Sequence, residues 1–90
     1  MSQVFTVVKM GNPEEPGYTE IDAIVDAGAT LAVVPRELAD KFGLEVTGEA
    51  TVQTGAGVLK LPRSRAWVEV EGKSEVIPIL ISDVIDRVLI

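Results

Sequence analysis

Short apolar stretches separated by turn-forming residues run through most of the sequence and constrain what it can fold into. Several of them alternate apolar and polar residues with a period of two, which is typical of strands that bury one face. The stretches cover residues 4–9, 18–25, 31–34, 49–54, 58–61, 66–71, 74–81 and 88–90. Many short strands joined by regular turns predict an all-β chain that forms a small antiparallel barrel or sandwich.

One short helix is predicted within this pattern. Pro35 suits the first turn of a helix, and Leu38 and Phe42 are four residues apart and share one helical face. Gly43 then provides a natural stop. We therefore expect a helix over residues 36–42.

Length and charge limit the class of protein. Ninety residues form one small domain, 1–90, which buries a modest fraction of its surface and would gain stability from a partner subunit. A net charge of −6 argues against nucleic acid as a partner, because no basic patch is present to neutralise phosphates. Neither a membrane-spanning stretch nor a signal-peptide pattern is found, so we expect a cytoplasmic protein with no membrane partner.

The lack of cysteine and histidine restricts the chemistry further. Without cysteine, neither disulfides nor thiolate metal sites can form. Without histidine, the chain can hold neither a Ser-His-Asp nor a Cys-His arrangement, nor a His-ligated zinc. Any hydrolytic chemistry must therefore rest on carboxylates, and we expect no metal and no cofactor.

The acidic loop Asp26-Ala27-Gly28-Ala29-Thr30 stands between two apolar strands. An apolar environment can raise the pKa of a carboxyl group, and the small neighbours leave room for a water molecule or a peptide backbone to approach. The alternative is an ordinary Asp-Gly turn, in which both residues serve only backbone geometry. A second glycine-rich segment, Gly55-Ala56-Gly57, reads as the tip of a hairpin that can approach a ligand closely.

The acidic loop resembles the active-site loop of retropepsin-like aspartic proteases, in which Asp-Thr/Ser-Gly-Ala/Ser-Thr/Ser lies between apolar strands. Asp, Gly, Ala and Thr match this pattern, whereas Ala27 replaces a hydroxyl residue. The order of elements along the whole chain is also similar to one retropepsin subunit, and closest to the single-lobe bacterial and archaeal members. In that order the segment at residues 54–57 corresponds to the tip of the flap.

This resemblance implies an endopeptidase that works as a homodimer on peptide or protein substrates, with one catalytic carboxyl, Asp26, from each chain. It also implies that small residues of the loop and the flap contact the substrate, and that two further loop residues shape the active site. The substrate-contacting residues would be Gly28, Ala29, Thr54, Gly55, Ala56 and Gly57, and the loop-shaping residues would be Ala27 and Thr30.

Two departures from the family pattern leave alternatives open. Ala27 lacks the hydroxyl that bonds across the dimer axis in the family, and the chain stops at Ile90, before the helix and terminal strand that follow in other members. A catalytically weak or inactive module of the same fold, which binds or dimerises, is the first alternative. An unrelated all-β domain with a chance turn motif is the second.

Overall fold

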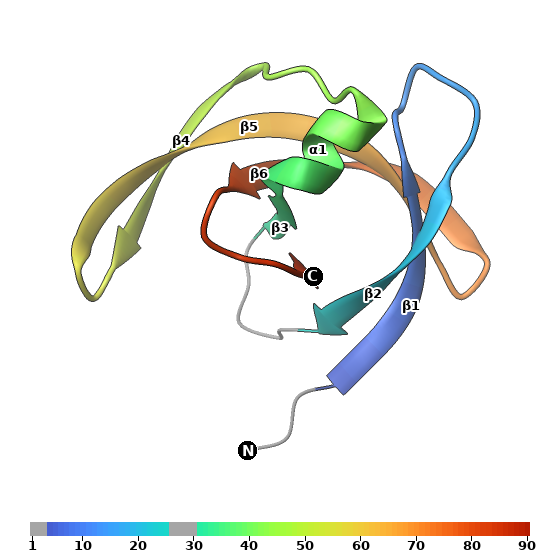
Figure 1. Ribbon diagram of the computed structural model, residues 1–90, viewed down its shortest axis with the longest axis horizontal. Helices are drawn as coiled ribbons and strands as arrows, with labels where there is room; N and C mark the ends of the chain where they lie inside the picture. Colours follow the sequence, from blue (N-terminus) through green and yellow to red (C-terminus); the bar gives the residue numbers. More distant parts are fainter. Residues whose placement is uncertain (1–3, 26–30) are drawn as a thin grey trace.

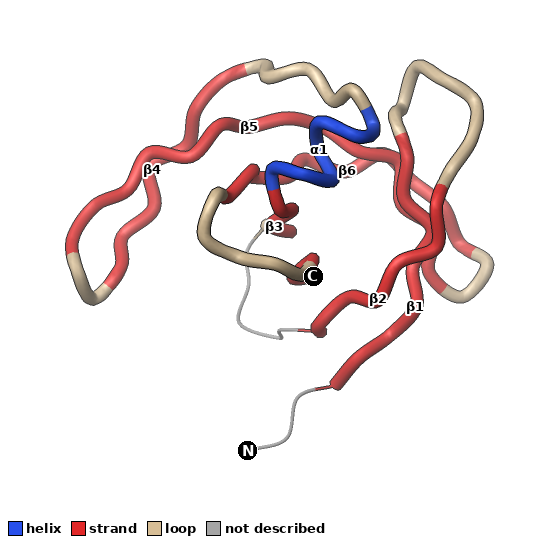
Figure 2. The backbone as a smooth tube through the Cα atoms, viewed as in Figure 1, coloured by secondary structure: helices blue, strands red, loops and turns tan. Residues whose placement is uncertain are grey.

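The computed structural model describes residues 4–25 and 31–90, and strands make up most of this part of the chain (Figure 2). The single helix within the same residues, α1 (Arg36–Phe42), follows the third strand directly. This confirms the predicted all-β fold with one short helix. The strands are β1 (Val4–Gly11), β2 (Thr19–Val25), β3 (Ala32–Pro35), β4 (Gly48–Thr54), β5 (Gly57–Val70), β6 (Lys73–Ser82) and β7 (Val88–Leu89).

Six of the described strands close into a barrel (Figure 1). The order of pairing is β1-β2-β7-β3-β6-β5, and β1 pairs with β5 to complete the ring. Among the described strands β4 pairs only with β5, so the β4–β5 hairpin extends from the barrel. Most pairings are antiparallel, as predicted, but β2–β7 and β3–β6 are parallel.

Alternation along β5 shows how the sequence fills this barrel. Ser64, Ala66 and Val68 are buried, whereas Arg63 and Arg65 are exposed. Because successive side chains of a strand point to opposite faces, one face of β5 lines the interior. The interior is built from small and aliphatic side chains, which suit a narrow barrel. The core consists of Val8, Met10, Ala23, Ala32, Val34, Ala39, Ala66, Val68, Ile79, Ile81 and Val88.

β5 runs through the point at which the sequence predicts a break. The sequence predicts separate strands over residues 58–61 and 66–71, yet both belong mainly to one strand of 14 residues. Pro62 fits within it because it pairs with Glu49 of β4 on one side, while pairing with β6 begins only at Arg63. Pro78 of β6 is placed similarly, because the pairing of β6 with β3 begins one residue later, at Ile79. Each proline therefore lies at a position where one edge of its strand has no partner, so the backbone N–H that proline lacks is not needed.

The turn between β5 and β6 lies one residue earlier than predicted. The sequence predicts a turn at Gly72 and Lys73, but Val70 pairs with Lys73 and the turn consists of Glu71 and Gly72. Their φ angles are 52° and 82°. Positive φ at both central residues defines the type I′ turn, whose twist matches that of the flanking strands.

The ends of α1 are set by the residues that the sequence indicated. Pro35 precedes the helix with φ −60° and ψ 145°, and Gly43 ends it in the left-handed region with φ 65°. The Leu44 N–H donates to the Ala39 carbonyl at 3.0 Å, which satisfies one of the last helical carbonyls. Ala39 is buried and Phe42 packs against the core, so the helix covers one part of the barrel.

Gly11 is required where β1 meets the returning arm of its own hairpin. Met10 pairs with Thr19, and a Cβ atom at Gly11 would lie 2.5 Å from the Gly17 carbonyl oxygen. Real Cβ atoms do not approach a backbone oxygen so closely, so a side chain here would push the loop and β1 apart. The absent side chain of Gly11 thus permits this close approach next to the β1–β5 pairing.

We predict that Gly11→Ala lowers the free energy of unfolding by about 1–3 kcal/mol, the usual cost of forcing an extra carbon into a packed site. Gly48→Ala is the matched control, because a Cβ atom added at Gly48 would meet no atom within 4 Å and its backbone needs no glycine. Urea unfolding of both variants measures the difference. Equal stability of Gly11→Ala and the parent protein would show that the hairpin has room for a side chain at this position.

Candidate active site

The candidate site lies between the end of β2 and the start of β3. Val25 ends β2 and Ala32 begins β3, and the acidic segment of the sequence joins them. The predicted catalytic and loop residues, Asp26, Ala27, Gly28, Ala29 and Thr30, lie outside the described residues. Their roles therefore stay predictions, and the geometry of the site comes from the strands that flank them.

β7 separates these two strands. Val88 and Leu89 pair in parallel with Ala23 and Ile24 of β2, and Leu89 also pairs with Val33 of β3. The Ile90 N–H adds a hydrogen bond to the Ile24 carbonyl at 2.9 Å. Because adjacent strands lie about 4.8 Å apart, an inserted strand holds β2 and β3 roughly 10 Å from each other.

The side chains that β2, β3 and β7 direct into the core are apolar. Ala23, Val34 and Val88, one residue from each of the three strands, are fully buried. Rigid strands of this kind hold a short connecting segment more reproducibly than a free loop would. The two strands that flank the acidic segment are thus held by a third strand between them, with a packed core below.

The second predicted element, the hairpin tip, is present at the predicted position. Thr54 pairs with Gly57, and Gly55 and Ala56 form the two-residue turn between β4 and β5. Gly55, Ala56 and Gly57 are exposed, and Gly57 has a φ of 126°, which residues with a side chain rarely adopt. Their contact with a substrate stays a prediction.

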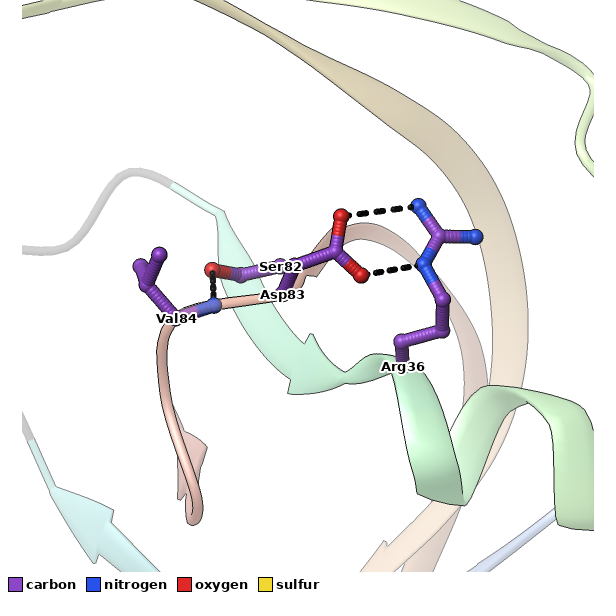
Figure 3. A network of polar contacts seen from close by, with 4 residues as sticks. All are labelled: Arg36, Ser82, Asp83 and Val84. Atoms are coloured by element: carbon purple, nitrogen blue, oxygen red, sulfur yellow. Dashed lines mark hydrogen bonds and ion pairs between the residues drawn. The ribbon is translucent and has the colours of Figure 1, made fainter.

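A polar network that sequence reasoning missed fixes the segment leading into β7 (Figure 3). Arg36, the first residue of α1, binds the Asp83 carboxylate through Nε and Nη2, the latter at 3.4 Å from Oδ2. The Ser82 hydroxyl oxygen accepts the Val84 N–H at 3.2 Å. Hydrogen bonding to Asp83 raises the pKa of Arg36 above its ordinary value. No sequence pattern links two residues 47 positions apart, so only the fold reveals this pair.

Exposed apolar side chains surround the same end of the barrel. Val4, Phe5 and Val7 of β1 and Val25 of β2 are each 44–60% exposed. Val4 pairs with Val25, the residue directly before the acidic segment. Among the described strands, β5 joins β1 only from Lys9 onward, so the first half of β1 pairs on one side only. Because successive side chains of a strand point to opposite faces, Val4 and Val25 lie on one face of the β1–β2 pair and Phe5 and Val7 on the other.

Two further observations concern ligands and membranes. In residues 4–25 and 31–90, no three acidic side chains gather closely enough to hold a metal ion. Within those residues, too, no helix has the length and apolar character needed to cross a bilayer.

Three features together define the class of retropepsin-like acid proteases. The six-stranded barrel is closed, a hairpin with glycines at its tip projects from it, and an acidic segment joins two strands that a third strand separates. The family model described as "Aspartyl protease" matches residues 9–89. The chain therefore belongs to the aspartyl protease family. No functionally curated protein matches the sequence.

Solved structures show the same fold. The chain aligns with the EIAV protease, solved in complex with the inhibitor HBY-793, at a TM-score of 0.73 and 13% identity, covering 98% of this chain and 80% of that one. The simian foamy virus (mac) protease gives a TM-score of 0.65 and 19% identity, over 94% and 86%. A retropepsin-like aspartic protease from Rickettsia conorii gives 0.59 and 19%, over 99% and 77%.

We predict that Gly57→Ala loosens the β4–β5 hairpin, because its φ of 126° strains any residue with a Cβ by about 1–3 kcal/mol. Gly55→Ala is the control on the other side of the same turn, since Gly55 does not have a positive φ and a Cβ atom added there would meet no atom within 4 Å. Faster amide hydrogen exchange in β4 and the first half of β5, in Gly57→Ala alone, is the expected result. Unchanged exchange in both variants would show that the turn tolerates a side chain.

Proposed function

We propose that the protein is an aspartic-type endopeptidase that acts as a homodimer, with Asp26 of each chain as its catalytic carboxyl. One observation carries the proposal. Asp26 is the only acid in the segment of small residues that joins β2 to β3, and β7 holds these two strands apart in an aspartyl protease fold. The lack of histidine and cysteine leaves carboxylates as the groups available for hydrolysis.

The chemistry needs two carboxyl groups, and the chain offers one at this position. Two chains related by a two-fold axis would bring Asp26 and its symmetry mate together. Two carboxylates about 3 Å apart do not both ionise easily, so the pair shares one proton and titrates as a unit. The ionised member activates a water molecule, and the protonated member polarises the scissile carbonyl.

The β4–β5 hairpin is suited to act as the flap. It extends from the barrel, its tip is exposed, and β4 has no second strand partner in the described part of the chain. An extended peptide could therefore pair with backbone groups of the hairpin while the tip excludes water. The small residues Gly28 and Ala29 would leave space for that peptide below, and Thr54, Gly55, Ala56 and Gly57 would contact it from above.

The exposed apolar side chains of Val4 and Val25, which share one face of the β1–β2 pair, support assembly next to Asp26. Exposed apolar side chains grouped beside a one-sided strand edge are typical of a surface that a partner covers. A partner placed here would meet the acidic segment directly, because Val25 precedes Asp26. This is the location that a shared pair of carboxyl groups requires.

A catalytically weak or inactive binding or dimerisation module is the second candidate, and Ala27 is the observation that favours it. The family places a hydroxyl residue at this position, where it bonds across the dimer axis. Ala27 can supply no such bond. The paired loops would then be held less rigidly, which lowers activity without changing the fold.

We predict that Asp26→Asn abolishes peptidase activity on an unfolded protein substrate, lowering the rate by at least about a thousandfold, because Asn cannot share the proton. Parent activity should be highest at acidic to mildly acidic pH, where the pair holds one proton. Asp22→Asn is the matched control, since Asp22 is an exposed acid on β2, the strand that leads to Asp26. Full activity of Asp26→Asn would refute the assigned role, and an inactive parent protein would favour the second candidate.

We also predict a weak dimer whose activity rises faster than linearly with protein concentration. Ala27→Thr should strengthen association by about 1 kcal/mol or somewhat more per dimer, the usual net contribution of a buried hydrogen bond. Analytical ultracentrifugation of both forms measures the change. A tight dimer that is indifferent to Ala27→Thr would show that other surfaces hold the subunits together.

A further inference from the structure

The loop between β1 and β2 forms a hollow at the end of the hairpin opposite to the candidate active site. The register pairs Val4 with Val25 at one end and Met10 with Thr19 at the other, so the loop lies a full strand length from Val25 (Figure 1). The hollow is lined by Pro13, Glu15, Pro16, Tyr18 and Trp67, together with Asn12 and Gly17. We call it the Tyr18 hollow.

Hydrogen bonds hold the loop in place. Asn12 Nδ2 donates to the carbonyl oxygens of Phe42 and Gly43 at 3.0 and 3.1 Å, which ties the loop to the end of α1. Its Oδ1 accepts the Glu14 N–H at 2.8 Å. At its far end the Gly17 carbonyl oxygen of the loop also lies close to Gly11. A site formed in advance loses little conformational entropy when a ligand binds.

Two of the four aromatic residues of the chain meet at this hollow. The rings of Tyr18 and Trp67 stack with their centres 5.8 Å apart, and Tyr18 stays 50% exposed. Lys9 Nζ lies 5.0 Å from the centre of the Tyr18 ring, which shows that this ring already accepts a cation. Grooves lined by exposed aromatic rings are typical of surfaces that bind proline-rich segments in the polyproline II conformation.

The charges at the rim indicate which kind of segment fits. Lys9 is paired with Glu69 at 3.3 Å, and that hydrogen bond raises the pKa of Lys9 above its ordinary value. Glu14 and Glu15 are exposed, and neither takes part in the two ion pairs found among the described residues. Two basic residues lie at neighbouring hollows of the same loop: Lys41 of α1 lines one of them, and Arg65 lines another together with Glu14 and Glu15. Glu15 is the one charged residue that lines the Tyr18 hollow, and Glu14 precedes it in the same loop.

We propose that the Tyr18 hollow binds a basic, proline-rich peptide segment of a partner or substrate protein. The rings of Tyr18 and Trp67 would pack against the prolines, and Glu14 and Glu15 would pair with neighbouring arginine or lysine side chains. The site is separate from the acidic segment and does not depend on the peptidase proposal.

Trp67 makes the test direct, because it is the only tryptophan in the chain and it lines the hollow. Its fluorescence is followed during titration with synthetic peptides of Pro-Pro-Arg, Pro-Pro-Glu or Gly-Ser-Arg repeats. The expected result is a saturable change with the Pro-Pro-Arg peptide, weakened by salt, and much weaker binding of the other two. No saturable change, or equal binding of the Pro-Pro-Glu or Gly-Ser-Arg peptide, would overturn the proposal.

Variants then assign the binding to this surface. Tyr18→Ala should raise the Kd for the Pro-Pro-Arg peptide more than about tenfold, as the loss of an aromatic anchor does, whereas Tyr18→Phe should keep most of the affinity. The double variant Glu14→Gln with Glu15→Gln should weaken binding, and Glu49→Gln, an exposed acid on β4, should not. Circular dichroism checks that each variant is folded. Unchanged affinity in folded Tyr18→Ala would place the binding elsewhere and refute the proposal.

Discussion

The insertion of β7 between β2 and β3 is the contact on which the arrangement of the candidate site depends. This strand has two residues, yet it pairs with both neighbours, and Val88 is fully buried beneath them. Without it the two strands that carry the acidic segment would have no common partner. A short strand near the C-terminal end of the sequence thus sets the spacing of a segment more than 50 positions earlier.

Closure of the barrel imposes the second constraint, which explains the choice of residues inside it. β1 meets β5 over three residue pairs, and β5 in turn connects to β6 over its whole second half. A ring of so few strands encloses little space, so its buried core holds aliphatic side chains, one methionine and a serine in place of aromatic rings. Ser64 is tolerated there because its hydroxyl donates to the Glu45 carbonyl.

Three of the four aromatic residues lie outside this core, at the two ends of the β1–β2 hairpin. Tyr18 and Trp67 stack at the loop end, beside acidic and proline residues. Phe5 lies at the other end, with the Arg87 guanidinium 5.6 Å from its ring centre. One end is suited to assembly around the acidic segment, and the other is a preformed hollow far from it.

Local patterns in the sequence were enough to determine the helix with its Pro35 and Gly43 boundaries, the hairpin tip at Gly55 and Ala56, and the strand-rich class. These features depend on neighbouring residues and on backbone preferences, which a single sequence displays. Tertiary structure alone decided the continuity of β5 through Pro62, the parallel pairings of β2 with β7 and of β3 with β6, and the Arg36–Asp83 ion pair. Each of these depends on which strand lies alongside another, and that choice is made by closure of the barrel between residues distant in the chain.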